Sequence, residues 1–414
     1  MFISAKQALE YWQKEGLLTQ KKASELEDSL DGAGAVVPHR AIKIFSAVGA
    51  VLIGLGVILF IASNWKEMTP VLKTAILMFG MIATAWAGYY LAYERKNYQW
   101  TGQALLFVNI LIFGASIFLV AQIYHLPLTF WWGALIWFTG AALFAYILQS
   151  KLHLWLSVPL FLLFLGWLKT YGATGFASEF NFLAGGRDTI FSLFPFLGVG
   201  ILSLGILHRK HPNLQFGEST LFHWGIFLTL LMFVVSTADK EVLFNYMRLP
   251  MDSIGISVLV GSLLAFLVAV IFGEYLTKEG RWGLMALSLY VAFIHVLAYA
   301  PRWLGFPLQP DYYGGGYNFY LTDVPLFKGL FVIHVILVVV LLLTVVWYGT
   351  LLKMPAVINM GMLGLAITIF IQYFSWAFEM LDRSLAFILG GVLILALSAV
   401  LERKRRQILT TMKQ

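Results

Sequence analysis

Residues 326–348 read LFKGLFVIHVILVVVLLLTVVWY, and residues 44–62 read IFSAVGAVLIGLGVILFIA. Because an α-helix rises 1.5 Å per residue, each of these apolar runs is long enough to cross the ~30 Å hydrocarbon core of a bilayer. Of the 414 residues, 60% are hydrophobic and 12% are charged, whereas soluble domains carry about 25% charged residues. Such a chain lacks the polar surface of a soluble fold. We therefore predict an all-α protein, a polytopic transmembrane helical bundle.

Twelve apolar segments are expected to span the membrane. They are residues 44–63, 71–92, 102–123, 128–148, 152–168, 190–207, 221–237, 254–276, 282–299, 328–349, 355–376 and 385–401. The two shortest, 152–168 and 221–237, could instead be re-entrant. With the N-terminus inside, 19 of the 28 Lys and Arg residues fall in inner segments and nine in outer segments. Because cytoplasmic loops are enriched in Lys and Arg, this bias predicts cytoplasmic N- and C-termini and an even number of spans.

The predicted spans divide the chain into five parts. Residues 1–40 form a cytoplasmic amphipathic helical hairpin and linker, 41–150 hold spans one to four, 151–281 hold spans five to eight, 282–401 hold spans nine to twelve, and 402–414 form a basic cytoplasmic tail. Residues 1–40 contain no apolar run, so the first span is expected to be retained rather than cleaved as a signal peptide.

The N-terminal hairpin is the candidate site for a cytoplasmic protein partner, over residues 1–35. Gly16 is expected to end its first helix in a left-handed conformation. The hairpin could equally dock on the membrane surface or on the protein's own cytoplasmic face. The outer loops 169–189, 238–253 and 300–327 are longer than most inner loops, so recognition by extended loops is expected from outside.

Composition also limits the chemistry. The chain has no cysteine, which excludes disulfides, thiol nucleophiles and cysteine metal sites. The net charge of +7 is explained by topogenic Lys and Arg residues, so we expect no nucleic-acid partner. We also expect no cofactor and no metal.

Two spans share a pattern that suggests an internal repeat. Asn109, Gly114, Ile117 and Gln122 have the same spacing as Asn359, Gly364, Ile367 and Gln372. The shared offset of 250 residues would relate spans one to four to spans nine to twelve as a parallel repeat. In transporters, the substrate site commonly lies at the interface of such repeats.

Polar residues inside spans need partners, because an unpaired polar group in hydrocarbon costs several kcal/mol. Several gather by predicted depth at the outer ends of spans one, three and eleven, where they could line one substrate pocket or simply be wetted by headgroups. They are Asn64, Gln122, His125, Gln372, Glu379, Asp382 and Arg383. The intramembrane polar residues Asn109, Asn359, His295 and His334 are candidates for interhelical hydrogen bonds, and such a histidine could also carry a proton. The cluster Arg403, Lys404, Arg405 and Arg406 is expected to bind anionic lipid headgroups.

Two stretches resemble a known family. Residues 47–65 read AVGAVLIGLGVILFIASNW, and residues 381–406 read LDRSLAFILGGVLILALSAVLERKRR. Together with the charged hairpin that holds Trp12 and Gly16, they resemble an uncharacterised family of bacterial predicted membrane proteins, a domain of unknown function. The resemblance implies a multi-pass protein of the bacterial inner membrane, and it implies no activity.

Three functions follow as hypotheses. The first is a transporter or flippase-like protein for a small or lipid-linked substrate. Its partners would be membrane lipids. The second is a non-catalytic scaffold or sensor that binds a partner through the hairpin. The third is a membrane enzyme acting on lipid-linked glycan at the outer face, through Arg302, Asp311 and His334. We favour the first hypothesis, and we favour a non-enzyme over an enzyme.

Overall fold

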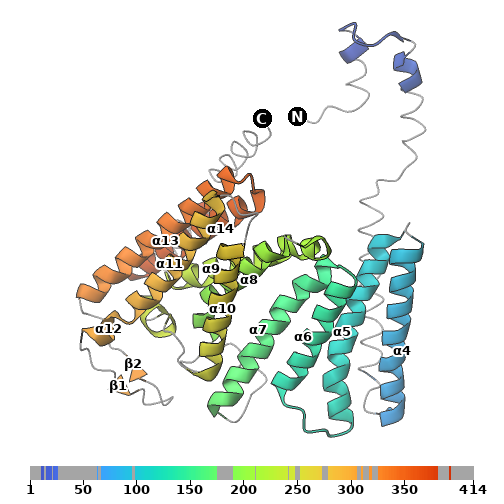
Figure 1. The fold of residues 1–414 in the computed structure, drawn as a ribbon, viewed down its shortest axis with the longest axis horizontal. Helices are drawn as coiled ribbons and strands as arrows, with labels where there is room; N and C mark the ends of the chain where they lie inside the picture. The colour runs from blue at the N-terminus through green and yellow to red at the C-terminus, as the bar shows by residue number, and fades with distance from the viewer. Residues whose placement is uncertain are drawn as a thin grey trace. The chain divides into compact units, whose positions relative to one another are not determined.

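The structure is a computed structural model, and it describes residues 11–13, 15–20, 22–26, 63, 67–95, 98–174, 190–209, 211–240, 242–247, 252–272, 278–304, 309–310, 317–318, 325–380 and 391–392. Its long helices are α4 (Pro70–Tyr89), α5 (Gln99–Ile123), α6 (Phe130–Ile147), α7 (Lys151–Thr174), α8 (Phe194–His208), α9 (Gln215–Val235), α10 (Ser253–Phe272), α11 (Lys278–Ala298), α13 (Pro325–Leu351) and α14 (Pro355–Met380) (Figure 1). The short elements are η1 (Tyr90–Glu94), η2 (Ile190–Leu193), η3 (Pro212–Leu214), η4 (Val242–Tyr246), α12 (Ala300–Trp303), β1 (Gln309–Pro310) and β2 (Tyr317–Asn318).

The described residues contain ten helical segments that are long and apolar enough to cross a membrane. They coincide with the second to eleventh predicted spans, which confirms a polytopic helical bundle. The first and twelfth predicted spans, 44–63 and 385–401, lie outside the described residues. The two spans that could have been re-entrant correspond to α7, with 24 residues, and α9, with 21 residues, so both have full spanning length.

The chain forms two compact units, Met1–Leu106 and Phe107–Gln414. In the first unit, Gly16 has a φ of 70°, the left-handed conformation that its place after the first short helix predicts. Helix α4 begins at Pro70, whose missing N–H suits the first turn of a helix. The Thr69 side chain caps this turn by accepting a hydrogen bond from the Leu72 amide.

The second unit is organised around the antiparallel pair α8 and α9. Ten of the 15 residues of α8 are buried, and α8 contacts α9, α10 and α11. The two helices approach closely at glycines, because a Cβ built on Gly225 would lie 2.6 Å from the Leu202 amide nitrogen. Around this pair, α6 packs on α7, α13 packs on α14, and both α7 and α14 contact α9. Helix α8 is therefore enclosed by protein rather than lipid.

One of the predicted outer loops is more compact than we expected. Within the predicted extended loop 238–253, η4 forms a π-helical turn, and the side chains of Leu243 and Phe244 in this turn and of Met247 directly after it are fully buried. Phe244 packs edge-on against Phe327 of α13, with ring centroids 5.5 Å apart. Burial of these large apolar side chains removes them from water, which explains why this part folds onto the bundle. The loop 300–327 contains the two-residue antiparallel strands β1 and β2.

Candidate functional site

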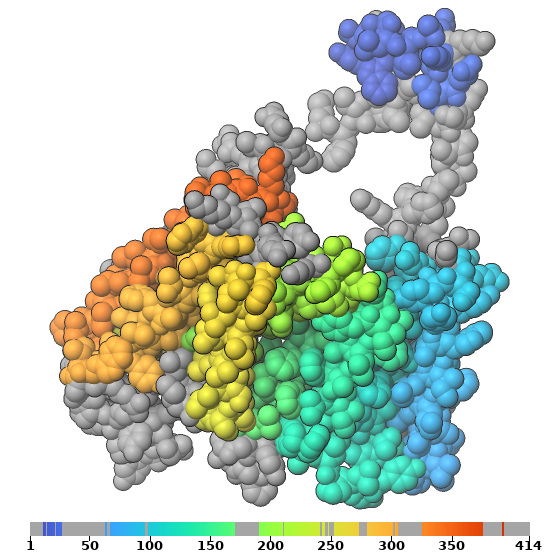
Figure 2. Space-filling view, in the orientation of Figure 1, coloured from blue at the N-terminus to red at the C-terminus, as the bar shows by residue number. Residues whose placement is uncertain are grey.

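A groove of about 450 Å³ lies between α7, α8 and α10 in the second unit. In the space-filling view, the surface is recessed between α7 (green) and α10 (yellow) (Figure 2). The groove is lined by Phe161, Leu165, Leu168, Leu197, Gly200, Ile201, Leu204, Ser253, Ile254, Ser257, Val258, Gly261, Ser262 and Ala265. Its volume falls within the range of about 300–1,000 Å³ that is typical of small-molecule sites.

The groove exists because α10 presents small residues to it. Ser253, Ser257, Gly261 and Ala265 recur every four residues, so they share one face of the helix. Small residues at this spacing normally allow a neighbouring helix to approach closely. Here α7 and α8 leave the face partly uncovered, because no atom lies within 4 Å of a methyl group built at Gly261. The result is an apolar channel edged by serine hydroxyls.

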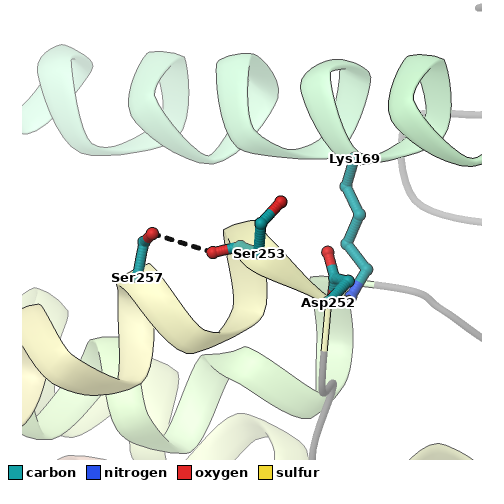
Figure 3. Close-up of polar contacts among 4 residues, drawn as sticks. All are labelled: Lys169, Asp252, Ser253 and Ser257. Atoms are coloured by element: carbon teal, nitrogen blue, oxygen red, sulfur yellow. Dashed lines mark hydrogen bonds and ion pairs between the residues drawn. The ribbon is translucent and has the colours of Figure 1, made fainter.

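An ion pair lies beside the groove, next to the lining residues Leu168 and Ser253. The Lys169 Nζ atom of α7 lies 3.1 Å from the Asp252 Oδ1 atom, in the residue that precedes α10 (Figure 3). The Lys169 side chain is 3% exposed, whereas the Asp252 side chain is 38% exposed. Lys169 is therefore a buried cation whose neutralising partner remains accessible.

The groove also carries hydroxyl groups near this pair. The Ser257 hydroxyl donates a 2.8 Å hydrogen bond to the Ser253 carbonyl, and both side chains lie in the space between α7 and α10 (Figure 3). The Ser257 hydroxyl oxygen retains acceptor capacity, since the bond uses only its proton. The site thus combines a long apolar surface with a charged and hydroxylated end.

Lys169 and Asp252 were not predicted as site residues from the sequence. The fifth span was expected to end at residue 168, with Lys169 in an outer loop, but α7 continues to Thr174. The two residues are 83 positions apart, so their pairing has no local signal. The one hint in the sequence is that Lys169 directly follows an apolar run, where a helix can extend beyond its hydrophobic stretch.

The structure describes the side chains of three of the predicted pocket residues, Gln122, His125 and Gln372. The Gln372 side-chain amide donates to the Thr237 carbonyl at the end of α9. Gln122 and His125 are exposed at the end of α5, where His125 has a φ of 51°. None of the described contacts joins Gln372 to either residue. Glu379 belongs to α14, but its side chain is not described. The residues Asn64, Asp382 and Arg383 and the basic cluster Arg403, Lys404, Arg405 and Arg406 lie outside the described residues.

The intramembrane polar residues are mostly buried. Asn109 is 4% exposed and Asn359 is half-buried. His295 is 1% exposed, with Nδ1 2.7 Å from the Val291 carbonyl and Nε2 3.2 Å from the Ser192 carbonyl. A neutral imidazole can donate to only one of these oxygens. The tautomer that carries its proton on Nε2 donates to the Ser192 carbonyl and so links α11 to η2.

His334 makes the second interhelical bond. Its Nε2 atom lies 2.8 Å from the Ser236 hydroxyl, and the Ser236 hydroxyl donates to the Phe233 carbonyl. Because that bond uses the only hydroxyl proton, Ser236 must accept from an Nε2–H group. His334 is fully buried, which does not fit its proposed place at an outer aqueous enzyme site. The side chain of Arg302 and residue Asp311 lie outside the described set.

Replacing Ser236 with alanine should lower stability modestly. The change leaves the His334 Nε2–H group buried without its acceptor, and interhelical hydrogen bonds in membranes contribute about 0.6–2 kcal/mol. Thermal unfolding of the purified variant in detergent measures the loss. The double variant with His334→Leu removes both polar partners and should recover part of the stability. Equal melting temperatures for wild type and Ser236→Ala would contradict this assignment.

The regular series of long apolar helices defines a polytopic α-helical membrane protein. Within the described residues, no group of three or more His, Asp or Glu side chains is placed to hold a metal ion.

Residues 10–154 match the family described as "Predicted membrane protein (DUF2157)". The match confirms the resemblance over this part of the chain, while the C-terminal stretch from Leu381 lies beyond it. No curated protein and no solved structure matches the chain.

Proposed function

We propose that the protein is a transporter or flippase-like protein of the bacterial inner membrane, and that it binds an amphiphile with an anionic headgroup in the α7–α8–α10 groove. The observation that carries the proposal is the buried Lys169 ammonium at the charged end of an apolar groove. Ionisable residues at membrane depth are costly to bury, and they commonly mark substrate or ion pathways.

The groove has the length of one bilayer leaflet. From Ser253 to Ala265 its α10 face rises about 18 Å at 1.5 Å per residue. Half of a ~30 Å hydrocarbon core is about 15 Å. An acyl or isoprenyl chain can therefore lie along this face with its headgroup beside Lys169. If both termini are cytoplasmic, Lys169 and Asp252 face the outer leaflet.

The ion pair favours an anionic headgroup. A phosphate oxygen can replace the Asp252 carboxylate on Lys169, because Lys binds phosphate through charge-assisted hydrogen bonds. The displaced carboxylate is already 38% exposed, so water can solvate it at small cost. A cationic headgroup offers no anionic oxygen for this exchange. In a zwitterionic headgroup such as phosphatidylcholine, the attached cation competes with Lys169 for the phosphate, so we expect the protein to discriminate against both.

Filling the groove should slow lipid movement. Ser257 lines the groove and is exposed, so Ser257→Trp places a large ring in the channel without changing any charge. In liposomes that contain the purified protein, we expect fluorescent phosphatidylglycerol to cross faster than in protein-free liposomes. We expect Ser257→Trp to slow that movement by about tenfold or more, equivalent to at least ~1.4 kcal/mol.

The neighbouring residue supplies a matched control. Ile256 is 46% exposed and does not line the groove, so Ile256→Trp adds the same ring outside it. Its rate should equal that of the wild type. Phosphatidylcholine should cross more slowly than phosphatidylglycerol. Equal rates with and without protein, or equal effects of the two tryptophans, would count against the proposal.

A scaffold or sensor role is the second candidate, because the N-terminal unit exposes large apolar side chains. Tyr11, Trp12 and Leu17 are 60%, 46% and 72% exposed. A photo-crosslinking residue at position 17 should capture one defined protein in cells, and the same residue at the exposed position Glu25 should not. Crosslinks to lipid alone would place the hairpin on the membrane surface instead.

A further inference from the structure

A second cavity, of about 410 Å³, lies on the other side of α8. It is bounded by α8, α9, α11, α13 and α14, and its lining is mostly apolar. The groove uses Leu197, Ile201 and Leu204 of α8, whereas the cavity uses Leu202 and Ile206. At 100° per residue, these two sets face nearly opposite directions. The central helix therefore separates two independent apolar spaces.

The cavity has a charged end and an apolar interior. At the C-terminal end of α8, the Arg209 Nε atom lies 3.6 Å from the Glu218 Oε1 atom, and both residues line the cavity. The Arg209 side chain is 58% exposed, and no described partner engages its two terminal amino groups. A guanidinium holds such groups in a fork that fits carboxylate or phosphate oxygens.

A buried hydroxyl adds a second polar feature. Tyr290 lines the cavity, and its hydroxyl oxygen is buried with no hydrogen-bond partner among the described residues. Buried hydroxyl groups are rarely left unpaired, so this hydroxyl is available to a polar atom that enters the cavity. From Gly280 to Tyr290, the α11 wall rises about 15 Å, which is the depth of one leaflet.

We infer that this cavity binds a single acyl chain that carries an anionic headgroup, with the headgroup at Arg209 and the chain between α9, α11 and α13. The Tyr290 hydroxyl belongs to the same cavity, about 15 Å further along α11 than Gly280, and it can donate to a ligand oxygen that reaches this depth. The charged end of this cavity lies at the opposite end of α8 from Lys169. The cavity therefore takes its ligand from the leaflet opposite to the one that the α7–α8–α10 groove faces. The inference does not rest on transport, since binding here requires no movement across the membrane.

Photolabelling in phosphatidylcholine nanodiscs tests the site. The probes are a diazirine-bearing palmitate and a diazirine-bearing lysophosphatidylglycerol. We expect either or both to label residues within 280–290 and 337–348, and unlabelled probe to compete. Labelling by palmitate alone identifies a fatty acid as the ligand class, and labelling by the lysolipid alone identifies an acyl ester. Labelling confined to lipid-exposed residues outside the cavity would overturn the inference.

Adjacent residues on α13 give a matched pair of variants. Thr344 lines the cavity, whereas Leu343 is 53% exposed and lies outside it. Thr344→Trp should reduce labelling at least tenfold, and Leu343→Trp should leave it unchanged. Equal labelling of the two variants would overturn the inference. Ser257→Trp, in the groove, should leave cavity labelling intact, so failure of the transport proposal remains distinguishable.

Two milder variants probe the polar contacts without filling the cavity. Arg209→Gln should weaken competition by unlabelled palmitate and leave competition by hexadecanol unchanged, because only the acid carries a charge. Tyr290→Phe should weaken lysolipid binding about fivefold, the loss expected for one neutral hydrogen bond. If neither variant changes competition by either anionic amphiphile, the assignment of the polar contacts is wrong.

Discussion

Replacing Asp252 with leucine is expected to destabilise the protein by about 3–5 kcal/mol, because the Lys169 ammonium would remain buried without its partner. Lys169 is 3% exposed, so its ammonium relies on the carboxylate for most of its stabilisation. The loss should appear as a lower unfolding midpoint in a denaturant titration of the purified protein.

A double-mutant cycle separates this effect from a simple packing defect. Lys169→Met together with Asp252→Leu removes both charges, and buried pairs replaced by apolar residues often lose little stability. The double variant should therefore be more stable than Asp252→Leu alone. Lys151→Met, at the exposed start of the same helix, should change stability by less than about 0.5 kcal/mol. Additive effects of the two substitutions would show that Lys169 and Asp252 do not interact.

Replacing Gly225 with alanine should destabilise the bundle by about 1–3 kcal/mol, although alanine is the better helix former. The new methyl group would lie 2.6 Å from the Leu202 amide nitrogen and 2.7 Å from its Cα atom. Backbone atoms of a buried helix cannot move aside locally, so α8 and α9 must separate. The unfolding temperature and the yield of monodisperse protein measure the effect.

Gly329 in α13 is the matched control for this substitution. No atom lies within 4 Å of a methyl group built at Gly329, so only helix propensity changes there. Gly329→Ala should be neutral or stabilising by up to about 1 kcal/mol. If Gly225→Ala were as stable as Gly329→Ala, the close approach of α8 and α9 would be wrong.

Several features of this protein were predictable from short stretches of sequence. The apolar runs predicted the ten long helices because crossing a bilayer depends on the length and hydropathy of a single segment. The family resemblance likewise came from short stretches of sequence, of which residues 47–65 and the hairpin that holds Trp12 and Gly16 lie within the matched residues 10–154. The conformation of Gly16 followed from its place after a short helix. The predicted orientation and the 250-residue repeat remain predictions, since the structure describes neither the first nor the twelfth span.

The candidate site required the tertiary structure. In helices such as α8, apolar residues lie on all sides of the axis, so hydropathy does not tell which face of the helix meets protein and which meets lipid. Only the fold pairs Lys169 with Asp252, buries Leu243, Phe244 and Met247, and encloses α8 among other helices. Membrane helices are thus determined locally, by transfer from water into hydrocarbon. Their partners are determined by packing and polar contacts between residues far apart in sequence, which no local pattern records.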